Sequence, residues 1–282
     1  MAVQFRATRR AVDLAVEKLK RDGVVHPDAG FNSEAPDGLR REVTYYDRDF
    51  LYRLGRTAAE EGVVDAALDL LRESGLVAPS SSYDKNACER HRHDLKAGFH
   101  GSWTSLSPTM ERLFYMLTSV RRPMHLLELG SFWGYTLAWF AGPCVGPHRA
   151  YRAERIVGID IDARMTARAR ENFAALSNCG EVELIAEDAR TAVERLPGTF
   201  DFLYIEAKAD DGEGEDEGLY LTLLEQLYER LPRGAWVMAH DNLDWSFSEE
   251  MRAYLAYVRD GSRFRESISF EIDSCGLELS IK

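Results

Sequence analysis

The sequence predicts an α/β fold in which a doubly wound, mostly parallel sheet is covered by helices on both faces. Two observations support this prediction. From residue 109 onward, short apolar runs alternate with segments of helical period, and the apolar runs themselves are nearly continuous. Continuous apolar runs are typical of parallel strands that are buried on both faces. Right-handed crossovers between such strands then produce a doubly wound sheet.

The first hundred residues have a different pattern, and we expect a helical region there. Apolar side chains recur at a helical period over 8–22, and 47–60 and 63–73 also look helical. Gly75 is placed to end the last of these helices. The polar, turn-rich run at 77–94 predicts a boundary close to residue 100. We therefore expect a helical N-terminal region, 1–100, before the main domain, 101–282.

The main domain is expected to begin with a helix at 109–120. Strands are then expected at 124–129, 155–160, 181–188, 200–206 and 234–241. Helices are expected between them at 135–141, 163–176, 189–195 and 217–230, with a further helix at 247–259. The last two runs, RFRESISFEI and GLELSIK, predict an antiparallel pair of strands joined by a turn around 274–276.

Composition excludes several classes of partner. The formal net charge is -12 and the pI is about 5.1, whereas binding to duplex nucleic acid or to an anionic membrane needs a basic surface. The four cysteines are scattered, which is typical of a reduced, cytoplasmic protein. No stretch has the length and apolar content of a signal peptide or a membrane span. We expect a cytoplasmic protein that binds neither nucleic acid nor membrane.

A glycine turn follows the first predicted strand, in the run ELGSFWGYT (128–136). Ligands of doubly wound sheets bind beyond the carboxyl ends of the strands, near the switch in strand order. The glycines at 130 and 134 allow a tight turn and a close approach by a ligand. The run is neither G-x-G-x-x-G nor a phosphate loop. Glu128, at the strand end, favours a ligand with a cationic or hydroxyl group over a diphosphate.

Two more acids end the next two predicted strands. Asp160 stands where an acid commonly binds a ribose diol, and Asp188 stands beside the expected place of an adenine amine. Three acids and one glycine turn suit an adenosine that carries a positive group and no phosphates. The predicted ligand is S-adenosylmethionine.

Over 101–282 the chain resembles the class I S-adenosylmethionine-dependent methyltransferases, and within them the catechol and caffeoyl-CoA O-methyltransferase group. The resemblance rests on the order and spacing of LLELGSFWGYT, VGIDID with ARENF, AEDA, FDFLYIEAK, LPRGAWVMAHDNL and GLELSIK. It implies a Rossmann-like, seven-stranded sheet whose last strand is antiparallel. By position it implies cofactor contacts at Glu128, Gly130, Ser131, Gly134, Thr136, Asp160, Ile161, Asp188, Ala189 and Glu206.

The same resemblance implies a divalent metal ion, Mg, Ca or Mn, held by Glu206, Asp241 and Asn242. Two positions depart from the family pattern. Glu206 stands where the family has Asp, and Lys208 lies two residues after it, whereas the general-base Lys of the family lies three residues after that Asp. Asp241, His240 and Lys208 are the candidate catalytic residues, since each can take a proton from an acceptor if no metal assists.

The expected activity is methyl transfer to a small-molecule acceptor, with oxygen as the favoured nucleophile. Alternatives are aminocarboxypropyl transfer, methylation of nitrogen or carbon, and a non-catalytic binding protein on a decayed methyltransferase fold. We expect a homodimer, with residues 1–100 covering the acceptor site, forming the dimer contact, or both. The run CERHRH (88–93) lacks a second pair of ligands, so a structural role is favoured over a metal site there.

Overall fold

The computed structural model describes residues 3–5, 58–100, 106–146, 149–176, 181–207, 209–210, 215–216, 218–242, 248–270, 272 and 276–282. The helix expected over 8–22 and most of the one expected over 47–60 lie outside these residues, as does Lys208. Among the described residues, no helix is long and apolar enough to cross a membrane.

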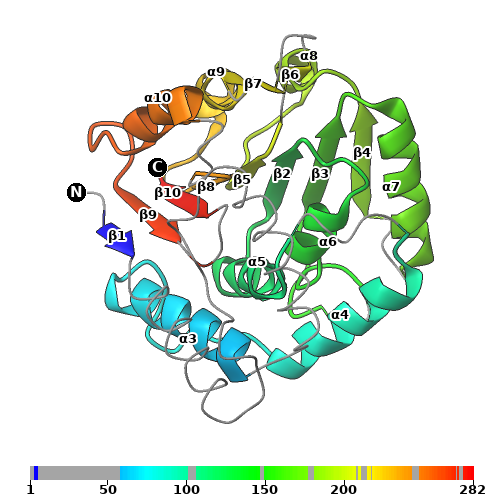
Figure 1. The fold of residues 1–282 in the computed structure, drawn as a ribbon, viewed down its shortest axis with the longest axis vertical. Helices are drawn as coiled ribbons and strands as arrows, with labels where there is room; N and C mark the ends of the chain where they lie inside the picture. The colour runs from blue at the N-terminus through cyan, green and yellow to red at the C-terminus, as the bar shows by residue number, and fades with distance from the viewer. Residues whose placement is uncertain are drawn as a thin grey trace, which may run out of the picture.

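One mixed sheet forms the centre of the fold, in the order β1-β9-β10-β8-β5-β2-β3-β4 (Figure 1). Its strands are β1 Val3–Phe5, β2 His125–Leu129, β3 Arg155–Asp160, β4 Val182–Ala186, β5 Phe202–Ile205, β8 Trp236–His240, β9 Glu266–Phe270 and β10 Leu277–Ile281. β10 runs antiparallel to both of its neighbours, and the other pairs are parallel. The expected seven-stranded sheet with an antiparallel last strand is confirmed.

Strand β1 is an eighth strand, and it lies in the N-terminal region, for which the sequence predicted helices. It pairs in parallel with β9 at the edge of the sheet, from Val3 opposite Ile268 to Phe5 opposite Phe270. Three residues are too few for a periodic pattern, and the open edge of β9 supplies the hydrogen-bonding partner. A second, two-stranded sheet joins β6 Ala209–Asp210 to β7 Glu215–Asp216.

The helices cover both faces of the sheet. They are α3 Ala58–Glu73, α4 Lys85–Gly98, α5 Pro108–Arg121, α6 Tyr135–Ala141, α7 Ala163–Ala175, α8 Ala189–Arg195, α9 Gly218–Leu227, the short 3-10 helix η1 Tyr228–Arg230, and α10 Ser248–Val258. Buried side chains of α3 to α7 form one hydrophobic cluster with the sheet, and those of α8 to α10 form another on the opposite face. Figure 1 shows these two groups of helices on either side of the strands.

Helix α4, Lys85–Gly98, begins inside the polar run at 77–94, whose composition indicated turns. The Asp84 carboxylate caps the helix by accepting a hydrogen bond from Ala87 N at 2.9 Å. Cys88, Arg92 and Leu95 are buried at a helical spacing. Because the buried face of this helix includes a charged residue, Arg92, a search for a periodic pattern of apolar residues does not detect it.

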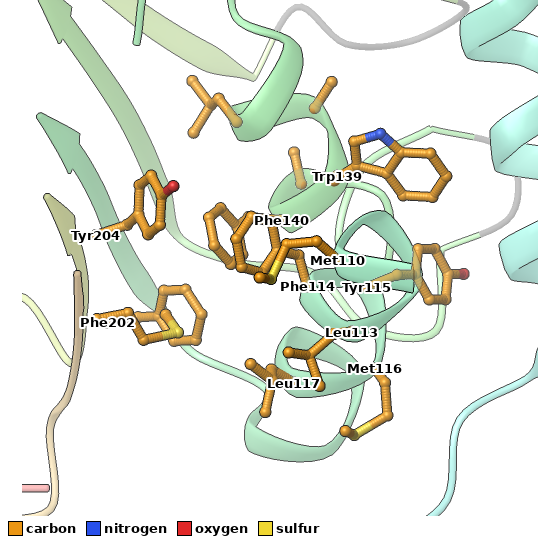
Figure 2. Close-up of a cluster of buried hydrophobic side chains, with 14 of the residues drawn as sticks. Met110, Leu113, Phe114, Tyr115, Met116, Leu117, Trp139, Phe140, Phe202 and Tyr204 are labelled. Atoms are coloured by element: carbon orange, nitrogen blue, oxygen red, sulfur yellow. The ribbon is translucent and has the colours of Figure 1, made fainter. Parts of the chain in front are cut away.

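The core beside the site consists mainly of aromatic side chains from α5, α6 and β5 (Figure 2). Phe114 stacks on Phe140 with ring centroids 4.4 Å apart, and both rings lie against Tyr204 at 5.4 and 5.0 Å. Each buried aromatic ring removes a large apolar area from water, so these contacts fix α5 and α6 on the sheet. The packing holds the end of β5 in place.

Buried ion pairs tie α3 and α4 to α5. Arg92 Nη2 lies 2.5 Å and Arg112 Nε 2.6 Å from Glu60 Oε1, and Arg112 also pairs with Glu89. Glu60, Arg92 and Arg112 are each less than 5% exposed. The described part of the N-terminal region therefore packs into the same core as the main domain, and the division at residue 100 stays a prediction.

Replacing Arg112 by alanine should destabilise the protein strongly. The change removes the guanidinium that pairs with the carboxylates of Glu60 and Glu89. Leaving these carboxylates without that partner in the protein interior should lower the free energy of unfolding by on the order of 3–5 kcal/mol. Urea denaturation measures the loss. Arg168→Ala is the matched control, because its pair with Glu171 is exposed and should contribute less than about 1 kcal/mol. Equal effects of the two variants would show that the buried network is not stabilising.

Candidate active site

The candidate site lies at the carboxyl ends of β2, β3, β5 and β8. The strand order reverses between β2 and β5, since β3 and β4 lie on one side of β2 and the later strands on the other. Glu128 belongs to β2, Asp160 ends β3, and Glu206 and Asp241 directly follow β5 and β8. Because these strands are neighbours and parallel, four acids from distant parts of the sequence meet at one edge of the sheet.

The glycine turn after β2 is shaped by close backbone contacts. Gly130 has φ +88, and a Cβ there would lie 2.4 Å from the carbonyl oxygen of Glu206. Gly134 has φ +80, and a Cβ there would lie 2.8 Å from the ring of Phe173. Only glycine fits both the left-handed conformation and the available space. The glycines are therefore required by the fold, and the glycine turn touches the backbone at the end of β5.

Asp160 locks the same turn from the next strand. Its Oδ2 accepts a hydrogen bond from Phe132 N at 2.7 Å, and its Oδ1 accepts one from Asp162 N at 2.8 Å. Burial raises the pKa of this carboxyl, and the two backbone hydrogen bonds oppose that rise. Phe132 is held at φ 46, and its ring stays exposed. Ile161, next to Asp160, is also exposed, so the predicted ribose side of the site is open to a ligand.

Glu128 is the most unusual side chain of the turn. It is fully buried, and neither carboxylate oxygen has a hydrogen-bond partner within the part of the chain that the structure describes. Burial raises the pKa of this carboxyl well above its usual value, and the negative charges of Glu206 and Asp160 raise it further. An unpaired buried carboxylate is costly, so the site is suited to a ligand that carries a positive charge.

The remaining predicted cofactor residues differ in their surroundings. Ser131 and Thr136 are buried at the turn and at the start of α6. Asp188 caps α8 through Arg190 N, and its carboxylate also pairs with the Arg190 guanidinium at 2.5 Å, which lowers the pKa of Asp188. Ala189 follows at the first position of α8 and is buried. Contact of Asp188 and Ala189 with adenine stays a prediction.

A second group of polar side chains lies beside the turn, where β5 and β8 end. His240 Nδ1 lies 3.2 Å from Glu206 Oε1 and 3.4 Å from Asp241 Oδ1. Tyr204 donates a hydrogen bond from its hydroxyl to Glu206 Oε2 at 2.7 Å. Asp241 has φ 63, a strained value for a residue with a side chain, and such strain is typical of functional sites. The structure thus brings together three predicted site residues, Glu206, His240 and Asp241.

Sequence reasoning missed Tyr204, although the sequence contains a signal for it. Tyr204 precedes Glu206 by two residues, and residues two apart on a strand face the same side. An alternation pattern was hidden because β5 is buried on both faces.

The amide nitrogen of Asn242, the third predicted metal ligand, binds side chains of β9 and β10. This Nδ2 atom donates to Ser269 Oγ at 2.7 Å and to Glu278 Oε2 at 3.0 Å. Glu278 is fully buried and pairs with Arg259 at 2.8 and 2.9 Å. Asn242 Oδ1, the amide atom that would bind a metal ion, is buried and has no hydrogen-bond partner among the described residues, and the imidazole of His240 lies between the two carboxylates. A metal role for Asn242 stays a prediction.

The run CERHRH has structural contacts in α4. Cys88 is buried, which raises the pKa of its thiol to about 12. His91 Nε2 lies 2.9 Å from the carbonyl oxygen of Ala138 in α6, and Arg92 belongs to the buried ion network. These contacts favour the structural role over a metal site.

Comparison with known proteins agrees with this geometry. Residues 127–242, which include the glycine turn and the ends of β3, β5 and β8, match a family described as a methyltransferase domain. An O-methyltransferase of Aspergillus thermomutatus is 27% identical over 179 residues, which cover 58% of this chain and 69% of that protein. Residues 127–242 are a methyltransferase domain. The assignment to the class I S-adenosylmethionine-dependent methyltransferases, made from the order of the motifs, is confirmed.

Solved structures show the same fold. An O-methyltransferase from Bacillus cereus in complex with SAH is 16% identical, with a TM-score of 0.51, and covers 77% of this methyltransferase and 97% of its own chain. A SAH-bound methyltransferase from Podospora anserina is 19% identical, with a TM-score of 0.53, over 75% and 94% of the two chains. At such low identities the likeness establishes the fold.

Replacing Gly130 by alanine should damage both folding and cofactor binding. The left-handed conformation costs alanine about 1–2 kcal/mol. The clash with the Glu206 carbonyl adds about 1–3 kcal/mol and displaces the turn. Gly198→Ala is the matched control, because Gly198 has φ +84 and nothing within 4 Å of its added Cβ. Denaturation and ligand titration of both variants separate the two costs, and equal results would show that the close approach is unimportant.

Replacing Glu128 by glutamine should stabilise the ligand-free protein at neutral pH. The pKa of Glu128 is raised on folding, so the folded state binds more protons than the unfolded state from about pH 4.3 upward. Stability therefore falls as pH rises through that window, up to the raised pKa, and glutamine removes this loss. Urea unfolding across the pH range tests it, with the exposed Glu183→Gln as control. A variant with an unchanged pH profile would contradict the assignment.

Proposed function

We propose that this methyltransferase moves the methyl group of S-adenosylmethionine to an oxygen of a small-molecule acceptor. The observation that carries the proposal is the fully buried Glu128 carboxylate, which has no hydrogen-bond partner among the described residues, beside a glycine turn at the reversal of strand order. That position calls for a cation, and the cofactor has a cationic ammonium and a sulfonium group. The SAH bound in the Bacillus cereus and Podospora anserina structures supports the same cofactor.

Each part of the cofactor has a candidate partner. The ammonium group binds at Glu128, and the ribose diol binds at Asp160 on the next strand. The hydroxyls of Ser131 and Thr136 face the methionine carboxylate. Ile161 is 68% exposed beside Asp160, and it covers the adenine ring once the cofactor binds. Asp188, already paired with Arg190, contributes to the adenine edge.

The acceptor binds against the ends of β5 and β8. The sulfonium methyl is a strong electrophile, so alignment of the acceptor oxygen in line with the methyl carbon supplies most of the rate. The acceptor hydroxyl must also lose its proton. Where no metal ion assists, Asp241 and His240 lie at the site to accept it, and Lys208 is a further candidate outside the described residues. The name of the Aspergillus thermomutatus relative supports oxygen as the nucleophile.

The proposal is tested by incubating the protein with S-adenosylmethionine and a panel of hydroxylated small molecules, followed by mass spectrometry. The expected product carries one added methyl group on oxygen, with stoichiometric formation of S-adenosylhomocysteine. A product with an added aminocarboxypropyl group, or with the methyl on nitrogen or carbon, would replace the proposed reaction. Binding of the cofactor without any turnover would favour a non-catalytic role. Sedimentation of the same sample tests the proposed homodimer.

Replacing Asp160 by alanine should weaken binding of S-adenosylmethionine by about 1–3 kcal/mol, the range for losing a charged hydrogen-bond partner. Titration calorimetry measures the change, and circular dichroism checks that the variant is folded. Asp69→Ala removes an exposed carboxylate from α3 and serves as the control, with no expected effect on affinity. Unchanged affinity in a folded Asp160→Ala protein would remove the ribose assignment.

A further inference from the structure

The side chains of Glu206, His240 and Asp241 are spaced as ligands of one metal ion. Each offers a ligand atom, and these atoms all lie within 4.8 Å of one another in the described part of the chain. His240 Nδ1 is 3.2 Å from Glu206 Oε1 and 3.4 Å from Asp241 Oδ1. Metal–ligand bonds of about 2.1 Å place neighbouring ligand atoms about 3.0 Å apart in an octahedron and about 3.4 Å apart in a tetrahedron. The two separations from His240 Nδ1, 3.2 and 3.4 Å, lie within this range of about 3.0 to 3.4 Å.

Negative charge at the site also favours a second cation beside the one that the cofactor brings to Glu128. Glu128 is fully buried on the neighbouring strand, with no hydrogen-bond partner on either oxygen among the described residues. The negative charge of Glu206 is one of the causes that raise the pKa of Glu128. The cofactor brings positive charge to Glu128 and the turn. The carboxylates of Glu206 and Asp241 lie at the next two strand ends, where a divalent ion would neutralise them.

Tyr204 orients the Glu206 carboxylate for this role. Its hydroxyl donates to Oε2 at 2.7 Å, and it is fully buried against Phe114 and Phe140, so it cannot swing away. The hydrogen bond engages one oxygen and leaves Oε1 directed at the imidazole. Carboxylate ligands of metal ions are commonly held by such outer hydrogen bonds.

We propose that Glu206, His240 and Asp241 form a divalent transition-metal site in which His240 Nδ1 is a nitrogen ligand. Imidazole nitrogen favours Co, Ni and Zn ions over the hard cations Mg and Ca, which bind oxygen ligands. The site therefore has a different metal preference from the all-oxygen set expected from the sequence. Metal binding is measured without cofactor or acceptor, so its outcome is independent of the proposed methyl transfer.

The experiment titrates chelator-treated, full-length protein with CoCl2, ZnCl2, MnCl2, MgCl2 and CaCl2 in a calorimeter. One Co or Zn ion should bind per chain, at least about tenfold more tightly than Mg or Ca. Pulsed electron paramagnetic resonance of the Mn-loaded protein should show coupling to one imidazole nitrogen. Equal affinity for Co and Mg, or no nitrogen coupling, would overturn the proposal. No metal binding at all would also overturn it, and would leave His240 donating a hydrogen bond to Glu206.

Variants identify the ligands. His240→Asn replaces the nitrogen ligand by an oxygen at a similar position, so Co and Zn affinity should fall by roughly tenfold or more while Mg affinity holds or rises. Tyr204→Phe should weaken metal binding by about 10-fold to 100-fold through the lost orienting hydrogen bond. A loss of folding alone would not change the ratio of Co to Mg affinity.

A matched control comes from His125, whose Nε2 lies 3.1 Å from the Glu154 carboxylate at the opposite end of β2. His125→Asn should leave the Co and Zn affinity unchanged. If His125→Asn abolishes binding and His240→Asn does not, the metal binds elsewhere and the proposal is wrong. A thiolate charge-transfer band in the Co-loaded protein would likewise place the metal on a cysteine and overturn it.

Discussion

The close approach of Gly130 to the backbone of Glu206 is the contact on which the geometry of the site depends. A Cβ at residue 130 would lie 2.4 Å from the Glu206 carbonyl oxygen, so the cofactor turn and the end of β5 are packed without space for a side chain. Glu206 N also donates to Leu129 O at 2.9 Å, which continues the pairing of β2 and β5 up to the turn. A cofactor held by the turn therefore lies directly beside the polar side chains that follow β5.

Negative charge at the sheet edge links binding to stability. Burial raises the pKa of Glu128 and of Asp160, so both carboxyls are less stable as anions in the folded protein than in water. Burial of the aromatic core of α5, α6 and β5 stabilises the fold and offsets the free-energy cost of these buried anions. Binding of a cation reduces the same cost. Ligands that carry positive charge should therefore stabilise the fold as well as occupy the site.

The N-terminal helices are coupled to the cofactor turn through buried polar contacts. Tyr135 directly follows Gly134, and its hydroxyl donates to Glu111 Oε1 at 2.6 Å. Glu111 faces Arg92 at 3.4 Å, and Arg92 pairs with Glu60 of α3. Burial raises the pKa of Glu111 to about 7. The described part of the N-terminal region thus supports the glycine turn through these buried contacts. This structural role is additional to the predicted role of residues 1–100 in covering the acceptor site.

The sequence by itself determined the order of elements and the acids at the strand ends. The bounds of β3, α6 and α8 agree with the predicted 155–160, 135–141 and 189–195, because apolar runs, caps and glycine turns are local signals. The methyltransferase assignment followed from the same order of motifs.

Only the tertiary structure decided which side chains meet. It bound the amide nitrogen of Asn242 to Glu278 and set His240 between Glu206 and Asp241. It also paired β1 with β9 and buried Arg92 of α4 against Glu60. Most of these contacts join residues far apart in the chain, and they depend on strand register and on helix packing across the sheet. Local patterns carry no information about such register, whereas the buried core selects one arrangement.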